Sequence, residues 1–281
     1  MEEVKTARSS LIEWAPIYSM WLRQVIRFFS QTSRVVTTFV QPFLFLSLMA
    51  IPMSRLFAGP ATGASQAYQQ MFQGLEFFAF LVPGMIGIGL LFSGTMGGLS
   101  VLWDKDFGFL KEVMVAPVSR LSLMIGRSLG AMTTALIQAL VTLGVALIFG
   151  VNFGFQLSSI GGFFMALVFM VLTFATFVGF GLTLGGVFED TEGFMGLVNL
   201  IQMPIFFLSG AMIPIRQLEG VPVLYQLQFI NPLTYGVDGI RACLTGTPSF
   251  IPLWLDLVVI FSFAVVMLIL GARAFDRMEV G

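Results

Sequence analysis

Residues that could perform enzymatic chemistry are scarce in this chain. None of the 281 residues is a histidine, which removes serine–histidine and cysteine–histidine pairs and every zinc site that needs an imidazole ligand. The single cysteine, Cys243, has no second cysteine to bond with, and we interpret it as a packing residue. Asp104 and Asp106 are two positions apart at the edge of an apolar run, which does not suit an aspartyl pair inside a membrane. An intramembrane protease or lipid transferase is therefore disfavoured.

ATP-driven work would need a separate ATPase, because the sequence has no G-x-x-x-x-G-K-[ST] loop to hold ATP phosphates. A short charged stretch suits contact with such a partner. Seven of the 29 charged side chains fall between Asp104 and Arg127, flanked by uncharged runs of 27 residues (77–103) and 61 residues (128–188). We expect a short helix there, with an apolar stripe on one side and Pro117 at its end, that docks in a groove of a soluble protein. A solvated connector is the alternative.

The candidate contact residues in this stretch are Asp104, Lys105, Asp106, Phe109, Leu110, Lys111, Glu112, Val113, Met114, Pro117 and Arg120.

The rest of the sequence indicates an integral membrane protein. Hydrophobic residues make up 57% of the chain and charged residues only 10%, whereas soluble domains carry about 25% charged residues. A helix of about 20 apolar residues crosses the hydrocarbon layer and satisfies its own backbone hydrogen bonds there. Hydropathy predicts six such spans, near Val35–Met53, Phe77–Leu99, Leu129–Gly150, Gly161–Val187, Phe194–Ile213 and Trp254–Ala272.

The distribution of basic residues predicts that both termini lie in the cytoplasm. In that orientation 11 of the 14 Lys and Arg residues are on the cytoplasmic side, and only Arg55, Arg216 and Arg241 are outside. Before the first span, apolar residues recur at helical spacing and predict an amphipathic helix in the membrane interface. This helix either anchors the first span or also grips a partner. Its apolar residues are Leu11, Trp14, Tyr18, Trp21, Val25 and Phe28.

The outer segment from Pro214 to Leu253 is about 40 residues long, too long for a structureless loop in a compact protein. Asn231 is expected to cap a helix that has Pro232 at its first position. Asp238 and Arg241 follow on that helix as an (i, i+3) pair, which most simply supports the helix locally.

Two blocks of the sequence resemble the permease subunits of the ABC-2 type exporter family. The first joins Pro83-Gly84 and a glycine-rich span to the run from Leu110 to Ala-Pro-Val-Ser-Arg120. The second is Phe-Phe-Leu-Ser-Gly-Ala-Met-Ile-Pro-Ile, residues 206–215, followed by Asn-Pro-Leu-Thr-Tyr-Gly-Val-Asp-Gly-Ile-Arg, residues 231–241. Both occur in the family's order, and the resemblance covers nearly the whole chain. Residues 107–111 depart from it, since relatives often have a more acidic, Gly-Thr-Leu-Glu-like stretch there.

The resemblance implies that the first helix is a connecting helix and the charged stretch a coupling helix, both touching an ATP-binding cassette subunit. ATP and Mg²⁺ would bind to that subunit, and no cofactor is expected in this chain. It also implies that the outer segment is a re-entrant gate. As a hypothesis of our own, Phe206 and Phe207 in the fifth span form a hydrophobic plug across a dimer axis. The gate and pathway residues would be Met203, Phe206, Phe207, Asn231, Tyr235, Asp238 and Arg241.

We therefore expect an all-α integral membrane protein with a single domain, residues 1–281. Its parts are a cytoplasmic tail and connecting helix (1–34), spans 1 and 2 (35–99), the coupling helix (100–128), spans 3 to 5 (129–213), the re-entrant segment (214–253), and span 6 with a second cytoplasmic tail (254–281).

The expected function is that of an exporter permease in the cell membrane, not an enzyme. It would pair with a second permease chain, identical or closely related, and with two ATP-binding subunits; membrane lipid is a further partner and nucleic acid is not. The cargo would be apolar or amphipathic: a drug, a lipid or a lipid-linked glycan. A membrane scaffold that binds an ATPase without transporting anything is the alternative.

Overall fold

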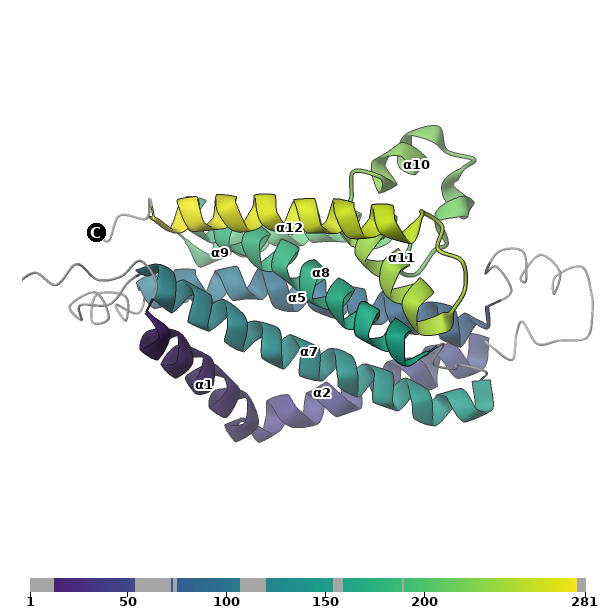
Figure 1. Ribbon diagram of the computed structural model, residues 1–281, viewed down its shortest axis with the longest axis horizontal. Coiled ribbons are helices and arrows are strands. Elements are labelled where there is room, and N and C mark those ends of the chain that lie inside the picture. Colours follow the sequence, from purple (N-terminus) through teal and green to yellow (C-terminus); the bar gives the residue numbers. More distant parts are fainter. Residues whose placement is uncertain are drawn as a thin grey trace, which may run out of the picture.

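The chain folds as a bundle of long helices (Figure 1). The computed structural model describes residues 13–53, 72, 75–106, 120–153, 159–188 and 190–276, and none of these lies in a β-strand. The helices are α1 (Trp14–Ser30), α2 (Thr32–Phe45) with the π-helical turn η1 (Leu46–Ala50), α5 (Phe77–Asp106), α7 (Arg120–Phe153), α8 (Ile160–Val187), α9 (Thr191–Leu208), the 3-10 turn η2 (Ile215–Leu218), α10 (Pro222–Gln228), α11 (Pro232–Thr245) and α12 (Leu253–Asp276).

Within these residues, six helical stretches are long and apolar enough to cross a membrane, which confirms the all-α, six-span prediction. The protein is therefore a multi-pass membrane protein. The stretches are Val35–Met53, Phe77–Gly97, Leu121–Gly150, Ile160–Val187, Thr191–Leu208 and Leu253–Ala274.

Two helices differ in extent from the predicted spans. The third span was expected from Leu129, but α7 begins at Arg120, because the charged residues there lower the hydropathy without interrupting the helix. With 34 residues, α7 is about 51 Å long at 1.5 Å per residue. The fifth span was expected to reach Ile213, but α9 ends at Leu208. Gly210 has a φ of 72°, a left-handed conformation that glycine adopts readily and a helix does not contain.

The predicted coupling helix lies mainly outside the described residues. Asp104, Lys105 and Asp106 are the last three residues of α5, and Arg120 is the first residue of α7. The role of the predicted coupling helix in docking a partner stays a prediction. The other candidates all belong to residues 107–119, outside the described part of the chain: Phe109, Leu110, Lys111, Glu112, Val113, Met114 and Pro117.

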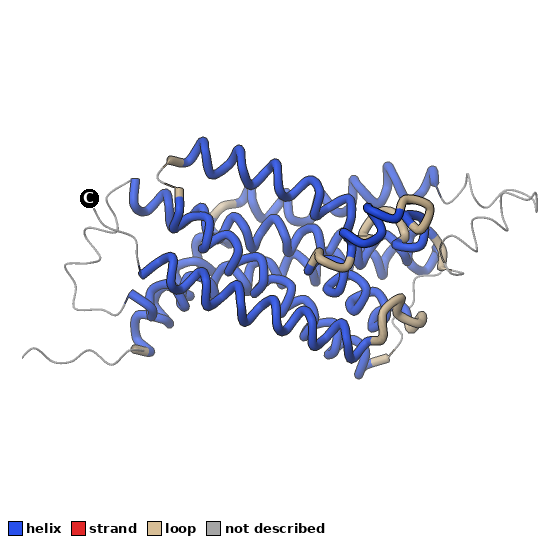
Figure 2. Tube along the Cα trace, turned by 90° about the horizontal axis from the view of Figure 1, so that it is seen from above, coloured by secondary structure: helices blue, strands red, loops and turns tan. Residues whose placement is uncertain are grey.

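The long helices run side by side along one axis (Figure 2), and α8 lies between α5 and α12 with almost no space between backbones. A Cβ atom at Gly181 would be 2.5 Å from the carbonyl oxygen of Thr95 on α5, and one at Gly179 would be 2.5 Å from the backbone of Met267 on α12. Small residues at these positions let the helices approach this closely. The three helices therefore pack with their backbones in direct contact.

Helix α1 lies along α7. The Trp21 indole Nε1 donates a hydrogen bond to Thr133 Oγ1 on α7, at 3.0 Å, and Phe28 is buried. Trp14 and Tyr18 point away from the bundle, with 80% and 59% of their surface exposed. The expected aromatic face is thus divided between the bundle and the outside, and its place in the membrane interface stays a prediction.

The amino-terminal end of α1 is attached to the first turns of α7. The backbone N–H of Glu13 donates to Ser122 Oγ at 2.8 Å. Four residues further on, a Cβ atom at Gly126 would be 2.6 Å from the carbonyl oxygen of Ile17. The two helices therefore meet with their backbones in contact at the end of the bundle where α5 ends and α7 begins. We call this the 106–120 end, and the opposite end the α11 end.

Candidate functional site

At the α11 end, side chains of α11 bond to backbone groups that α9 leaves free. The last four carbonyls of a helix have no partner within it, and Asn231 Nδ2 donates to one of them, the Ile205 oxygen, at 2.7 Å. Asn231 Oδ1 also accepts from the Leu233 N–H at 3.0 Å, so that it caps α11 in the way the Asn-Pro pair predicted. One buried amide therefore joins two helices.

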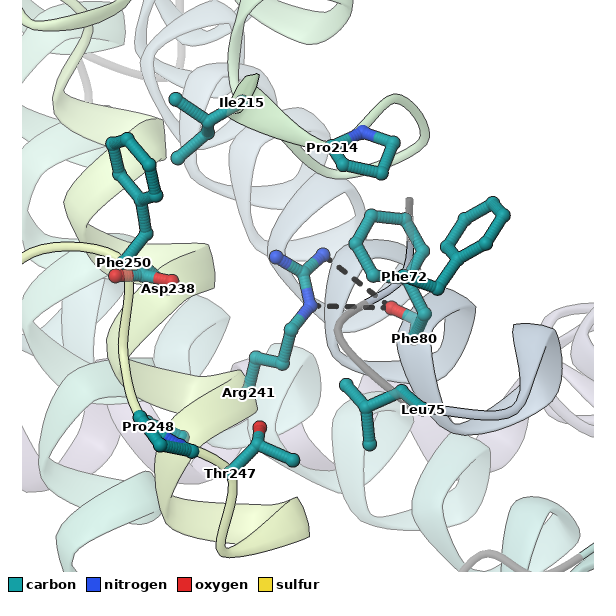
Figure 3. Close-up of a pocket in the computed structure, with 11 residues that line it drawn as sticks. Phe72, Leu75, Phe80, Pro214, Ile215, Asp238, Arg241, Thr247, Pro248 and Phe250 are labelled. Atoms are coloured by element: carbon teal, nitrogen blue, oxygen red, sulfur yellow. Dashed lines mark hydrogen bonds between the residues drawn. The ribbon is translucent and has the colours of Figure 1, made fainter. Parts of the chain in front are cut away.

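Arg241 joins three segments, and Figure 3 shows its contacts with one of them, at Phe80. Its Nη2 atom donates to the Gly210 carbonyl oxygen at 2.8 Å, in the turn after α9. Nε and Nη2 each lie 3.4 Å from the carbonyl oxygen of Phe80, in the first turn of α5, and the guanidinium carbon is 3.9 Å from the centre of the Phe80 ring. Burial lowers the pKa of Arg241 to about 10, so that the side chain is still a cation near neutral pH.

Asp238 bonds to a different segment from those that Arg241 contacts. Its Oδ2 atom accepts from the Ile251 N–H at 2.9 Å, in the loop before α12. Burial raises the pKa of Asp238, and the Ile251 hydrogen bond and the Arg241 charge oppose that shift. The two residues were expected to support α11 locally as a pair, but their hydrogen bonds hold different neighbouring segments. The reason is burial: a buried charge needs hydrogen-bonding partners, and the ends of adjacent helices supply them.

The remaining gate candidate on α11, Tyr235, donates its hydroxyl to the Phe229 carbonyl oxygen at 2.7 Å and so closes the turn between α10 and α11. The cavity beside Arg241 and Asp238 measures only about 20 Å³. A volume of this size holds a water molecule but no transported molecule. Among the described residues, this cavity at the α11 end therefore has no room for a transported molecule.

The three candidates on α9 are not part of this network. The rings of Phe206 and Phe207 meet edge to face, with centroids 4.8 Å apart. Phe207 is 52% exposed and Met203 is 61% exposed. The structure thus brings Asn231, Tyr235, Asp238 and Arg241 together in one buried region, while Met203, Phe206 and Phe207 form part of the surface of α9.

Sequence reasoning missed the backbone partners of Arg241 and one buried side chain. Nothing in the sequence marks the carbonyl groups of Phe80 and Gly210 as acceptors. Gln202 on α9 is 2% exposed, and neither atom of its amide group has a hydrogen-bond partner among the described residues. Its signal was available, because a glutamine in the middle of an apolar span is unusual.

Comparison with known proteins assigns the chain to a family. Residues 16–245 match the sequence model of the ABC-2 type transporter family. The match covers most of the chain and includes α1 from Pro16 onward, all the spans before α12 and the whole of α11. The chain therefore belongs to the ABC-2 type transporter family.

Several curated proteins are similar to this chain. The "Probable multidrug ABC transporter permease YbhR" of Escherichia coli K12 is 28% identical over 170 residues, which are 58% of this chain and 43% of YbhR. The "Probable doxorubicin resistance ABC transporter permease protein DrrC" of Mycobacterium tuberculosis H37Rv is 24% identical over 247 residues, 87% of this chain and 79% of DrrC. "Nodulation protein J" of Rhizobium leguminosarum is 27% identical over 183 residues, 62% of this chain and 64% of that protein. The chain spans about half the length of several relatives.

Proposed function

We propose that this chain is the permease subunit of an ATP-binding-cassette exporter. Family membership supports this proposal, as does the lack of a phosphate-binding loop in the sequence. Two permease chains, identical or closely related, would form the membrane part, and each would bind an ATP-binding subunit that carries ATP and Mg²⁺. The 106–120 end and both termini would be cytoplasmic, in line with the distribution of Lys and Arg.

The observation that carries the proposal is the buried network at the α11 end. Eleven of the 14 residues of α11 are buried, and Asn231 and Arg241 tie this helix to α9, to the turn after α9 and to α5. In our proposal this network is an outer gate in its closed state. Since α9 is joined to α11 by a few hydrogen bonds at one end, movement of α9 away from α11 would open the gate.

The proposed cargo is an apolar or amphipathic molecule that leaves the cell. The names of YbhR and DrrC refer to multiple drugs and to doxorubicin resistance, and we infer a similar cargo for this chain. A lipid or a lipid-linked glycan is the other class with an apolar body, and it would suit the same path.

The proposal is tested by isolating the chain from its native membrane in mild detergent and identifying the proteins that copurify. An ATP-binding-cassette subunit should copurify with the wild-type chain. It should be lost when Phe109, Leu110, Val113 and Met114 are replaced by alanine. A matched control replaces two exposed apolar residues of α10, Val223 and Leu227, by alanine and should keep the subunit.

The purified complex is then placed in lipid vesicles, and ATP-dependent movement of doxorubicin is measured. If no ATPase copurifies with either version of the chain, that result contradicts the proposal. An ATPase that copurifies without any movement of doxorubicin or of fluorescent lipid would favour the scaffold alternative.

A further inference from the structure

Gln202 is a polar side chain in an unusual place. It lies near the middle of α9, which is one of the six candidate spans, and only 2% of its surface is exposed. Both its Nε2 and its Oε1 atom are without a hydrogen-bond partner in the part of the chain that the structure describes. Burial of an unpaired amide costs free energy, so this residue works against the closed packing around it.

The amide interrupts an otherwise apolar seam between α9 and α5. The buried residues of α9 are Phe194, Val198 and Gln202, spaced four apart on one face. Phe194 and Val198 pack against apolar side chains of α5 and α8. Three residues beyond Gln202, Ile205 packs against a second apolar cluster that contains Leu91 of α5. Gln202 therefore sits between two apolar contacts of the same seam.

A second amide lies on the open side of the same helix. Asn199 is exposed and precedes Gln202 by three residues, so that the two amides are neighbours on the helix surface. Met203 and Phe206 continue this side of α9 at the next helical positions. Polar residues within membrane spans face the interior of a bundle or a water-filled cavity rather than lipid. This side of α9 should therefore border a path that water or a polar group can enter.

Contact with a second copy of the chain does not account for both amides. A partner docked on the exposed side of α9 would reach Asn199, but Gln202 is already covered by its own chain. Its amide becomes accessible only when α9 moves away from the helices that pack on its buried face, α5 and α8. Helix α9 suits such movement, because three of its 18 residues are buried. In addition, Pro204 has no N–H to bond the carbonyl group one turn earlier, which weakens the helix beside Gln202.

We propose that Asn199 and Gln202 form the hydrogen-bonding contact for the transported molecule, in a path that Met203 and Phe206 border. This inference rests on the proposed export function and narrows its cargo to amphipathic molecules that carry hydroxyl, carbonyl or amide groups on an apolar body. An amide offers both donors and an acceptor, and a site built to hydrogen-bond a polar group discriminates strongly against analogues that lack it. When the seam opens, the cargo or water supplies the partners that Gln202 lacks in the closed state.

Water access to the two positions is the first test. Cys243, the only cysteine, is replaced by alanine, and Asn199→Cys, Gln202→Cys and Leu200→Cys are made one at a time in the full complex in native membrane vesicles. Leu200 is the matched control, because it is 70% exposed and lies about 100° around the helix from Asn199, on the side away from Gln202. A hydrophilic, positively charged thiol reagent is added, which reacts with thiolates in water.

Asn199→Cys should react at least roughly tenfold faster than Leu200→Cys, since a thiol facing lipid ionises poorly. Gln202→Cys should react slowly without nucleotide and several times faster with ATP and Mg²⁺. A Gln202→Cys reaction no faster than that of Leu200→Cys in every nucleotide state would overturn the inference, because the seam would then never open to water.

The choice of cargo is the second test. Doxorubicin, which carries hydroxyl and carbonyl groups, should slow the labelling of Asn199→Cys, and the hydrocarbon diphenylhexatriene should not. Gln202→Leu should lose most export of doxorubicin while its melting temperature stays equal to the wild-type value or rises, because leucine needs no hydrogen-bond partner. Equal slowing by both probes, or wild-type export by Gln202→Leu, would refute the proposed contact. Wild-type vesicles that do not export doxorubicin would count against the cargo proposed above, while the labelling still decides whether the seam opens.

Discussion

Replacement of Arg241 by methionine should lower the free energy of unfolding by about 3 kcal/mol, and the structure supplies the terms of this estimate. The 2.8 Å bond from Nη2 to the Gly210 oxygen is charge-assisted and contributes about 1.5–3 kcal/mol. The guanidinium carbon lies 3.9 Å from the centre of the Phe80 ring, and a desolvated cation–π contact of this kind contributes up to about 2 kcal/mol. The two 3.4 Å contacts with the Phe80 oxygen are long and add little. Methionine restores part of the apolar packing, which reduces the expected loss in the free energy of unfolding.

The assay is reversible unfolding of the purified chain by sodium dodecyl sulfate titrated against a mild detergent, followed by the fluorescence of the four tryptophans. Arg241→Lys keeps the charge but not the planar fork, and should show about half of the loss. Arg216→Met is the matched control, because Arg216 is exposed and its charge lies 5.7 Å from the Phe250 ring. If the free energy of unfolding of Arg241→Met is within about 0.5 kcal/mol of the wild-type value, Arg241 does not hold the α11 end together.

Three further predictions concern other contacts. Asn231→Ala removes a helix cap and the bond to α9, and the free energy of unfolding in the same titration should fall by about 2 kcal/mol; an unchanged value would mean that water replaces the amide. Gly181→Leu forces a side chain into the backbone of Thr95, so we expect folded chain to be nearly absent on size-exclusion chromatography, whereas a normal yield would show that α5 and α8 separate easily. Alanine at both Phe206 and Phe207 should raise the leak of doxorubicin from vesicles without ATP, and an unchanged leak would contradict the hydrophobic plug.

Local signals in the sequence predicted several of these features. Apolar stretches of about 20 residues predicted the spans, because a helix in hydrocarbon needs little more than length and apolar side chains. The Asn231-Pro232 pair predicted the start of α11, since both the cap and the first position of a helix depend on nearby backbone groups. These features depend only on residues a few positions apart.

Features that depend on distant residues were not predictable. The acceptors of Arg241 belong to Phe80 and Gly210, which are 161 and 31 positions away and are recognised through backbone atoms that every residue has. The early end of α9 depends on a single positive φ angle at Gly210, which hydropathy does not register. Gln202 was overlooked for a different reason: the residue is visible in the sequence, but a hydropathy average over a span conceals one polar side chain.

The length of α7 has a mechanical consequence for the whole bundle. A continuous rod of 34 residues, about 51 Å long, converts a tilt of about 5° at one end into a displacement of about 4 Å at the other. The first turns of α7 follow directly after residues 107–119 and are fastened to α1 by the contact of Ser122 with Glu13. A force on this end would therefore tilt α1 and α7 together, and the displacement would be largest at the opposite end of α7, near Phe153.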